Sequence, residues 1–219
     1  MVNYRFKDGF KKDLSVGKIV CLARTYRKHA EEMNSNVTDE PLLFLKPASS
    51  VIFDGESIII PKVSNCLHHE VELGVVIGKK CKNVKERDAM QYVLGYLLGL
   101  DITARDIQSE AKRNGWPWGI AKGFDTFAPI SSVVLKEKVS DPHDLNISLM
   151  INDKVRQKSN TSYMIYSIGR IIEFISSVMT LEVGDLILTG TPGGVAEIKS
   201  GDVLKAELGD ICTLRVNVR

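Results

Sequence analysis

The segment LHHEVELGVVIG, residues 67–78, has the pattern of a strand that enters a hydrophobic core. Side chains two positions apart in a strand point to the same face, so Glu70 and Glu72 share one face while Val71 and Leu73 share the other. Residues 75–77, which follow, are all apolar. We therefore predict a strand that carries two carboxylates on one face.

Runs typical of strands dominate the rest of the chain. They lie at residues 18–22, 42–46, 57–60, 71–78, 96–103, 146–151, 185–189, 202–208 and 212–218. Helices are fewer: short ones are expected at residues 26–34 and 86–92. A longer one is expected at about residues 162–179, where apolar residues recur at i, i+3, i+4 and i+7. This order excludes a regular βαβ alternation, and hence a Rossmann fold, and predicts a β-rich α+β fold.

Length and charge set the broad class of protein. The 219 residues suit one domain, and we expect a short N-terminal extension at residues 1–16 and a single domain at residues 17–219. The 29 basic and 27 acidic residues give a net charge of +2, which provides no basic surplus for nucleic acid or an anionic membrane. The longest uncharged apolar stretch, residues 92–100, is too short for a membrane helix. We expect neither nucleic acid nor membrane as a partner.

The cysteines indicate the compartment. There are four, they form no CxxC pair, and each lies in or beside an apolar run: Cys21, Cys66, Cys81 and Cys212. Free, largely buried thiols in a reducing compartment are expected, not a zinc ribbon. The N-terminus lacks the apolar region of a signal peptide. Cytoplasm is therefore the expected location, or the mitochondrial matrix if the source is a eukaryote.

Three acidic residues are candidate metal ligands. Asp101 follows the apolar residues 92–100, so it too is expected on a buried strand. Glu70 and Glu72 on a strand entering a core would repel each other and lose hydration, and a divalent cation removes both costs. Carboxylates without a Cys/His cluster suit Mg²⁺ or Mn²⁺. The alternative is that Glu70 and Glu72 lie on the wet face of an edge strand, and the residues alone leave the two interpretations even.

A histidine and a glutamate form a second candidate constellation. His29 and Glu32 share a face if residues 26–34 are helical, and a carboxylate that orients an imidazole makes a general base. A solvated surface helix is the alternative, and it is favoured when the segment is taken alone.

Three further segments carry polar groups with more than one interpretation. Residues 115–119, GWPWG, predict an ordered loop that is either a lid or a structural cap. Lys122 lies between small residues and is either a snorkelling lysine or a partner for an anion. The turn LTGTPGGV, residues 188–195, offers amides and the Thr191 hydroxyl to a carboxylate. No GxxxxGK[ST] or GxGxxG motif is present, so no nucleotide is implied.

Five segments together carry a family resemblance. HHEVELGVVIG, LDITARDIQ, GWPWGIAKGFDTFAP, SYMIYSI and GDLILTGTPGGV follow one another in the order seen in the fumarylacetoacetate hydrolase superfamily. The chain most resembles its short single-domain acylpyruvases and oxaloacetate decarboxylases, and the resemblance extends from residue 18 to about 218. It implies a mixed-sheet roll or barrel with a few helices, usually found as a homodimer.

The resemblance also implies roles for nine residues. The resemblance implies that the His29–Glu32 dyad and Lys122 are catalytic residues. Glu70, Glu72 and Asp101 match the metal ligands of the family, and Arg24, Gln108 and Thr191 match its substrate-binding residues. The chain departs from the family at two loops: the usual GRNY has Ala23 and Thr25, and the usual GVGPV reads GVAEI, with Ala196 and Glu197.

The resemblance implies a Mg²⁺- or Mn²⁺-dependent enzyme that cleaves a carbon–carbon bond of a short 2-oxo acid and leaves pyruvate as its enolate. Acylpyruvate hydrolysis and oxaloacetate decarboxylation are the two expected forms. Alternatives are oxaloacetate tautomerisation, isomerisation or decarboxylation in aromatic catabolism, and an inactive metal-stabilised binding protein. Because Glu70, Glu72 and Asp101 repel one another, we expect the fold to survive an amide in place of any of them.

Overall fold

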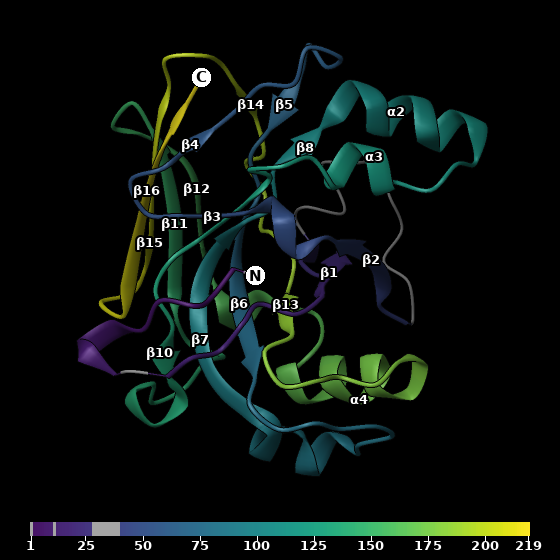
Figure 1. The fold of residues 1–219 in the computed structure, drawn as a ribbon, viewed down its shortest axis with the longest axis vertical. Coiled ribbons are helices and arrows are strands. Elements are labelled where there is room, and N and C mark those ends of the chain that lie inside the picture. The colour runs from purple at the N-terminus through teal and green to yellow at the C-terminus, as the bar shows by residue number, and fades with distance from the viewer. Residues whose placement is uncertain (1, 11, 28–39) are drawn as a thin grey trace.

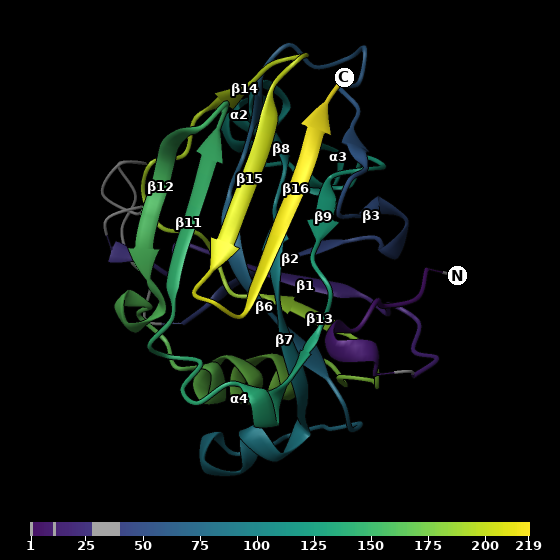
Figure 2. The same cartoon turned by 90° about the vertical axis from the view of Figure 1, so that its left-hand side faces the viewer.

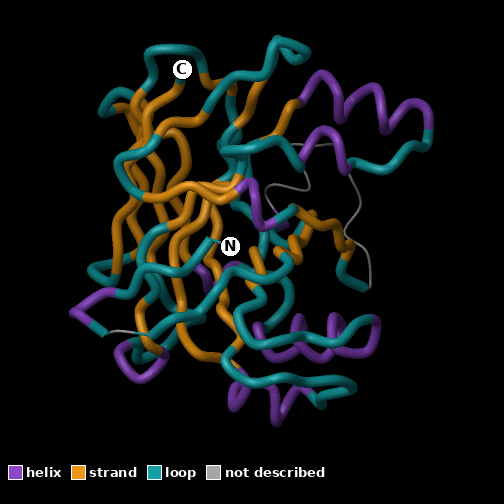
Figure 3. The backbone as a smooth tube through the Cα atoms, viewed as in Figure 1, coloured by secondary structure: helices purple, strands orange, loops and turns teal. Residues whose placement is uncertain are grey.

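The computed structural model describes residues 2–10, 12–27 and 40–219. Within these residues most of the secondary structure is strand (Figure 3). The strands form an eight-stranded, a five-stranded and a three-stranded sheet. The expected β-rich α+β fold with a curled mixed sheet is confirmed.

The eight-stranded sheet contains the strand predicted from residues 67–78. Its order along the sheet is β2 (Leu42–Lys46), β1 (Ile19–Ala23), β13 (Leu186–Leu188), β6 (Val71–Ile77), β7 (Val93–Leu100), β9 (Ala128–Ile130) and β3 (Val51–Phe53), and β10 (Val134–Leu135) pairs with β7. β1 pairs with β13 in parallel and β6 pairs with β7 antiparallel, so the sheet is mixed. Every residue of β6 is buried, as its apolar run predicts.

The other two sheets are smaller. The five-stranded sheet has the order β12 (Lys154–Asn160), β11 (Asn146–Ile151), β15 (Val203–Leu208), β16 (Cys212–Val218) and β4 (Ser57–Ile58). Figure 2 shows its long strands face on. The three-stranded sheet has the order β14 (Glu197–Ile198), β5 (Leu67–His68) and β8 (Thr103–Ala104).

Three α-helices and several 3₁₀ turns are present among the described residues. The α-helices are α2 (Arg105–Asn114), α3 (Gly119–Lys122) and α4 (Ile168–Val178). The 3₁₀ helices are η1 (Lys7–Gly9), η2 (Ala48–Ser50), η3 (Glu86–Tyr92), η4 (Lys136–Lys138) and η5 (Thr161–Tyr163). The helix expected at residues 86–92 is η3, and most of the one expected at residues 26–34 lies outside the described residues. Figure 1 shows α2 and α3 side by side, on the opposite side of the molecule from the five-stranded sheet.

The helix expected at residues 162–179 begins later than its apolar period suggests. The side chain of Ser167 accepts a hydrogen bond from the Arg170 amide, so Ser167 caps α4 at its N-terminus. The preceding backbone pairs with another segment instead: Met164 bridges Tyr26, and the Ile165 amide donates to the Thr25 carbonyl at 2.8 Å. The prediction of a helix before residue 168 was therefore wrong, because tertiary pairing takes those backbone groups.

Helix α2 and strand β12 are the longest elements that have no counterpart in the sequence-based expectations. Helix α2 buries only Gln108 and Ala111, and strand β12 buries only Gln157 as a fully enclosed side chain. Both elements are largely polar, so neither shows the apolar periodicity on which such expectations depend.

The N-terminal residues pack on the eight-stranded sheet. Tyr4, Leu14 and Val16 are buried in a cluster with Ile19 and Leu186, and the Tyr4 hydroxyl donates to the Gly184 carbonyl at 3.0 Å. The division at residue 16 stays a prediction.

Two expectations from composition can be compared with the structure. The four cysteines are free, and three of them are buried, as expected. Across the described residues no helix has both the length and the apolar character needed to span a membrane.

Candidate metal centre and active site

The register between β6 and β7 brings the three acidic residues together. Glu70 directly precedes β6, Glu72 lies within it, and Asp101 directly follows β7. Glu72 pairs with Gly99, and the Asp101 amide donates to the Glu70 carbonyl at 2.8 Å. One carboxylate oxygen from each of the three lies within 4.8 Å of the others, and all three residues are buried. β6 lies between β13 and β7, so the alternative of a wet edge strand is wrong.

Lys122 lies between two of these carboxylates. Its ammonium donates to Glu70 Oε2 at 3.0 Å, to Asp101 Oδ2 at 2.5 Å and to Thr103 Oγ1 at 2.7 Å. Burial by itself lowers the pKa of Lys122, but the charges of Asp101 and Glu70 outweigh it and raise the pKa overall. The lysine is only 2% exposed, so it does not snorkel, and it stays charged at neutral pH.

Lys46, at the end of β2, is a second buried lysine that the sequence did not single out. Its ammonium donates to the carbonyls of Ile102, Lys122 and Phe127 at 2.6–3.0 Å. It also lies 2.8 Å from Asp101 Oδ1, an oxygen that accepts no hydrogen bond from the described residues. Lys46 thus neutralises the Asp101 oxygen that Lys122 does not contact. By donating to the Lys122 carbonyl, it also holds the end of α3 in place.

Helix α2 contributes an arginine and a glutamine. Arg105 makes an ion pair with Glu70 Oε1 and donates to Gln108 Oε1 at 2.6 Å. Its Nε also donates to His68 Nδ1 at 3.3 Å. Glu70 is therefore held by cations from two helices. Arg105 was not among the predicted site residues, although it belongs to the DITARD segment that contains Asp101.

Glu72 is held by a turn that requires glycine. The Gly190 amide donates to Glu72 Oε2 at 2.7 Å. Gly190 has φ +94°, and a Cβ at this position would lie 1.9 Å from Thr25 Oγ1. Thr25 itself is buried and donates to the Thr189 carbonyl at 2.7 Å, so this departure from the family sequence supports the turn. Burial, followed by the charges of Asp101 and Glu70, raises the pKa of Glu72 well above its usual value.

Gln157 connects β12 to the turn that contains Thr191. Its amide nitrogen donates to Thr191 Oγ1 at 2.8 Å and to the Pro192 carbonyl at 2.9 Å, and its oxygen accepts from the Val71 amide at 3.0 Å. The Thr191 hydroxyl donates to the Val71 carbonyl at 2.9 Å, so its proton is committed to the backbone.

His69 is neutral in the same network. Its Nδ1 lies 2.9 Å from the acceptor oxygen of Gln157, so Nδ1 carries the proton. Burial is the main reason that its pKa falls to about 4. His69 therefore acts here as a neutral hydrogen-bond donor.

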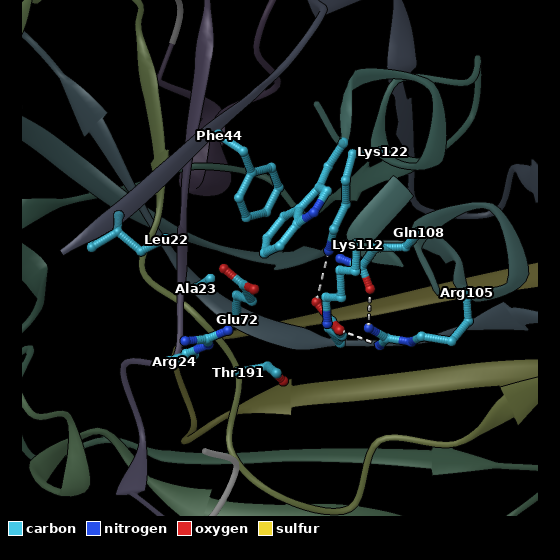
Figure 4. Close-up of a pocket in the computed structure, with 12 residues that line it drawn as sticks. Leu22, Ala23, Arg24, Phe44, Glu72, Arg105, Gln108, Lys112, Lys122 and Thr191 are labelled. Carbon is cyan, nitrogen blue, oxygen red and sulfur yellow. Dashed lines mark hydrogen bonds and ion pairs between the residues drawn. The ribbon is translucent and has the colours of Figure 1, made fainter. Parts of the chain in front are cut away.

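One pocket collects most of the predicted site residues (Figure 4). It is lined by Leu22, Ala23, Arg24, Phe44, Glu70, Glu72, Arg105, Gln108, Lys112, Trp118, Lys122 and Thr191. Asp101 is buried behind this lining, in contact with Lys122. His29 and Glu32 lie outside the described residues. Of the two tryptophans, Trp118 lines the pocket and Trp116 is exposed. Phe44 and Lys112 are lining residues that the sequence did not indicate.

The donor set fits a hard divalent cation. Three convergent carboxylates, held by backbone amides and ammonium groups, match the oxygen ligands that Mg²⁺ and Mn²⁺ take. The raised pKa of Glu72 also favours a bound cation, because a nearby cation would offset the cost of burying the charged carboxylate.

The chain is similar in sequence to proteins of known name. The family model described as fumarylacetoacetate (FAA) hydrolase C-terminal matches residues 18–219. A human protein named oxaloacetate tautomerase FAHD1, mitochondrial, is 48% identical over 200 residues, which cover 91% of this chain and 90% of that protein. A protein of Dictyostelium discoideum named oxaloacetate decarboxylase, mitochondrial, is 47% identical over 197 residues and covers 90% of each chain.

A solved structure agrees with the sequence relatives. The fumarylpyruvate hydrolase of Pseudomonas aeruginosa, solved in complex with Mn²⁺ and pyruvate, superposes with a TM-score of 0.93 at 32% identity. The match covers 98% of this chain and 94% of the hydrolase. The chain therefore belongs to the fumarylacetoacetate hydrolase family of enzymes.

Proposed function

We propose that this protein is a Mg²⁺- or Mn²⁺-dependent enzyme that breaks a carbon–carbon bond of a short 2-oxo acid and releases pyruvate through its enolate. The observation that carries the proposal is the buried trio of Glu70, Glu72 and Asp101 beside a pocket that also contains Lys122 and Arg105. The named activities of the relatives, on oxaloacetate and fumarylpyruvate, support this substrate class.

The trio would hold the dication in this proposal, and the bound dication would stabilise the negative charge that develops on the 2-oxo oxygen. Lys122 is charged and buried, and its three ammonium protons are donated to Glu70, Asp101 and Thr103. It would attract the substrate carboxylate or the developing enolate through its charge, and a hydrogen bond to substrate would replace one of these three. Gln108, the backbone amides of the turn that contains Thr191, and Arg24 at the end of β1 would orient the rest of the substrate.

Two chemistries share this arrangement. Hydrolysis of an acylpyruvate requires a water to attack the distal carbonyl, and we propose that His29 and Glu32 activate it. Decarboxylation of oxaloacetate requires no water, because the electrons of the breaking bond move to the 2-oxo group as CO₂ leaves. Tautomerisation of oxaloacetate is a second candidate that the name of the human relative supports. On the family resemblance we also propose a homodimer, located in the cytoplasm or the mitochondrial matrix.

A substrate panel tests the proposal. Oxaloacetate, fumarylpyruvate and acetylpyruvate would be supplied to protein treated with EDTA and then to the same protein with Mg²⁺ or Mn²⁺ restored. We expect turnover of at least one substrate, its loss with EDTA and its recovery with metal. Loss of ketone absorbance without pyruvate would indicate tautomerisation. No turnover with either metal would favour an inactive binding protein.

The dyad has its own prediction. We expect Glu32→Gln to shift the ratio of acylpyruvate hydrolysis to oxaloacetate decarboxylation towards decarboxylation by about 10²-fold, the lower end of what general-base catalysis supplies. The amide keeps the size of the side chain but removes the charge that raises the basicity of His29. The ratio would be measured at saturating metal for both substrates. Equal losses in both reactions would contradict a role in water activation.

A further inference from the structure

Cationic residues outnumber anionic ones in the part of the pocket lining that the structure describes. Four of its lining residues are cationic, namely Arg24, Arg105, Lys112 and Lys122, whereas two, Glu70 and Glu72, are anionic. The buried pair of Asp101 and Lys46 behind the lining leaves this surplus unchanged. A divalent cation on the trio would add two more positive charges. Such a pocket favours a substrate with two negative charges over one with a single charge.

The position of Lys112 distinguishes it from the other cations. Arg105, Gln108 and Lys112 are spaced i, i+3 and i+7 on α2, so they lie on one face of the helix, and all three line the pocket. Arg105 pairs with Glu70, whereas Lys112 makes no ion pair or hydrogen bond with the described residues. Figure 4 shows Lys112 among the side chains that line the pocket.

An aromatic pair holds the Lys112 ammonium at the pocket. The ammonium lies 5.3 Å from the centre of the Trp118 ring, a cation–π distance, and Trp118 contacts Phe44 with 5.8 Å between ring centres. A cation–π contact leaves ammonium protons available to an anion, because the ring face takes no N–H proton in a conventional hydrogen bond. Trp118 therefore positions the Lys112 ammonium, whose protons can still be donated to an anion.

The charges around Lys112 also favour a bound anion. Its pKa is lowered, first by burial and then by the neighbouring charges of Arg105 and Arg24, and Glu70 only partly offsets them. A carboxylate placed beside Lys112 would relieve this repulsion.

We propose that Lys112 binds a second carboxylate of the substrate, so that the site selects dicarboxylic 2-oxo acids over monocarboxylic ones. This inference rests on the proposed function, in which the first carboxylate and the 2-oxo group lie at the metal trio. The far end of the substrate then extends towards Trp118 and Lys112. Oxaloacetate and fumarylpyruvate carry the second carboxylate, whereas acetylpyruvate ends in a methyl group.

Lys112→Met is the main test, because methionine keeps the unbranched chain and the helix propensity but removes the charge. We expect the KM for oxaloacetate and fumarylpyruvate to rise about tenfold, as for the loss of one charge-assisted hydrogen bond, with kcat for fumarylpyruvate changed less than about twofold. The KM for acetylpyruvate should stay within about twofold of wild type. Lys112→Arg keeps the charge and should retain the preference for the dicarboxylic substrates, whereas Arg113→Met, at a neighbour on α2 that does not line the pocket, should behave like wild type.

A binding measurement separates this inference from the proposed function. The Mn²⁺-loaded protein would be titrated by calorimetry with 2-oxoglutarate and with 2-oxopentanoate, which differ only in the terminal carboxylate. We expect wild type to bind the dianion about tenfold more tightly and Lys112→Met to bind both equally. If wild type turns over the panel but Lys112→Met changes KM equally for all three substrates, or for none, the role of Lys112 is overturned. If wild type turns over no substrate, the proposed function fails instead.

Discussion

Replacing Glu72 with glutamine is expected to lower turnover by about 10³-fold or more while leaving the metal-free protein folded. A metal ligand supplies several kcal/mol of transition-state stabilisation through the ion it holds, and about 4 kcal/mol corresponds to 10³ in rate. The fold should survive because Glu72 makes no ion pair with the described residues, and its Oε2 accepts from the Gly190 amide, which an amide oxygen also satisfies.

The metal-free variant should be at least as stable as wild type. Burial and the charges of Asp101 and Glu70 raise the pKa of Glu72 in the folded state. Wild type without metal therefore loses stability as the pH rises from the unfolded-state pKa through the folded-state value, and Glu72→Gln removes this loss. Thermal unfolding with EDTA at several pH values measures it. Mn²⁺ should raise the Tm of wild type but not of Glu72→Gln, by linkage. A retained Mn²⁺ shift with wild-type turnover would contradict the role of Glu72.

Glu70→Gln and Asp101→Asn form an informative comparison. The expectation that any of the three acids tolerates an amide considered only the repulsion between them. In the structure Glu70 is the counter-ion of Arg105 and Lys122, and Asp101 is the counter-ion of Lys46 and Lys122. Removing either carboxylate leaves a buried cation short of negative charge, so these two variants should be less stable than Glu72→Gln without metal.

Lys46→Met is expected to lower the free energy of unfolding by about 3–5 kcal/mol, the range for breaking a buried ion pair by removing one partner. The lysine side chain is fully buried, and its loss leaves Asp101 Oδ1 without its cation and the carbonyls of Ile102, Lys122 and Phe127 without this donor. The methionine fills similar space, so the change reports the lost polar contacts more than a cavity.

Lys205→Met is the matched control, because Lys205 pairs with Asp153 at the surface, where the two side chains are 42% and 78% exposed. Exposed ion pairs contribute about 0–1 kcal/mol, so this variant should unfold close to wild type. Urea unfolding of both variants in EDTA makes the comparison without any contribution from metal. Equal stability of Lys46→Met and Lys205→Met would show that the buried ammonium adds nothing to the fold.

The pattern of apolar residues correctly predicted the strands that are buried in the core. The alternation at Glu70, Val71 and Glu72 and the apolar run at residues 92–100 indicated β6 and β7, because burial of one or both faces of a strand requires that pattern. The same reasoning missed α2 and β12, whose surfaces are mostly polar. It also started α4 too early, because a period of 3.6 does not reveal that Thr25 and Tyr26 pair with the backbone at Ile165 and Met164.

The sequence by itself determined the β-rich fold class, the strand that carries Glu70 and Glu72, and, through the family resemblance, six of the residues that line the pocket: Arg24, Glu70, Glu72, Gln108, Lys122 and Thr191. Only the tertiary structure decided the partners of three polar side chains. Lys46 neutralises Asp101, Gln157 donates to Thr191, and the Lys112 ammonium lies over the Trp118 ring. The reason is physical. Apolar periodicity is set within a segment, whereas the partners of a buried polar group are set by sheet register and packing. Lys46, for example, finds its acceptors at Ile102, Lys122 and Phe127, 56 to 81 positions away along the chain.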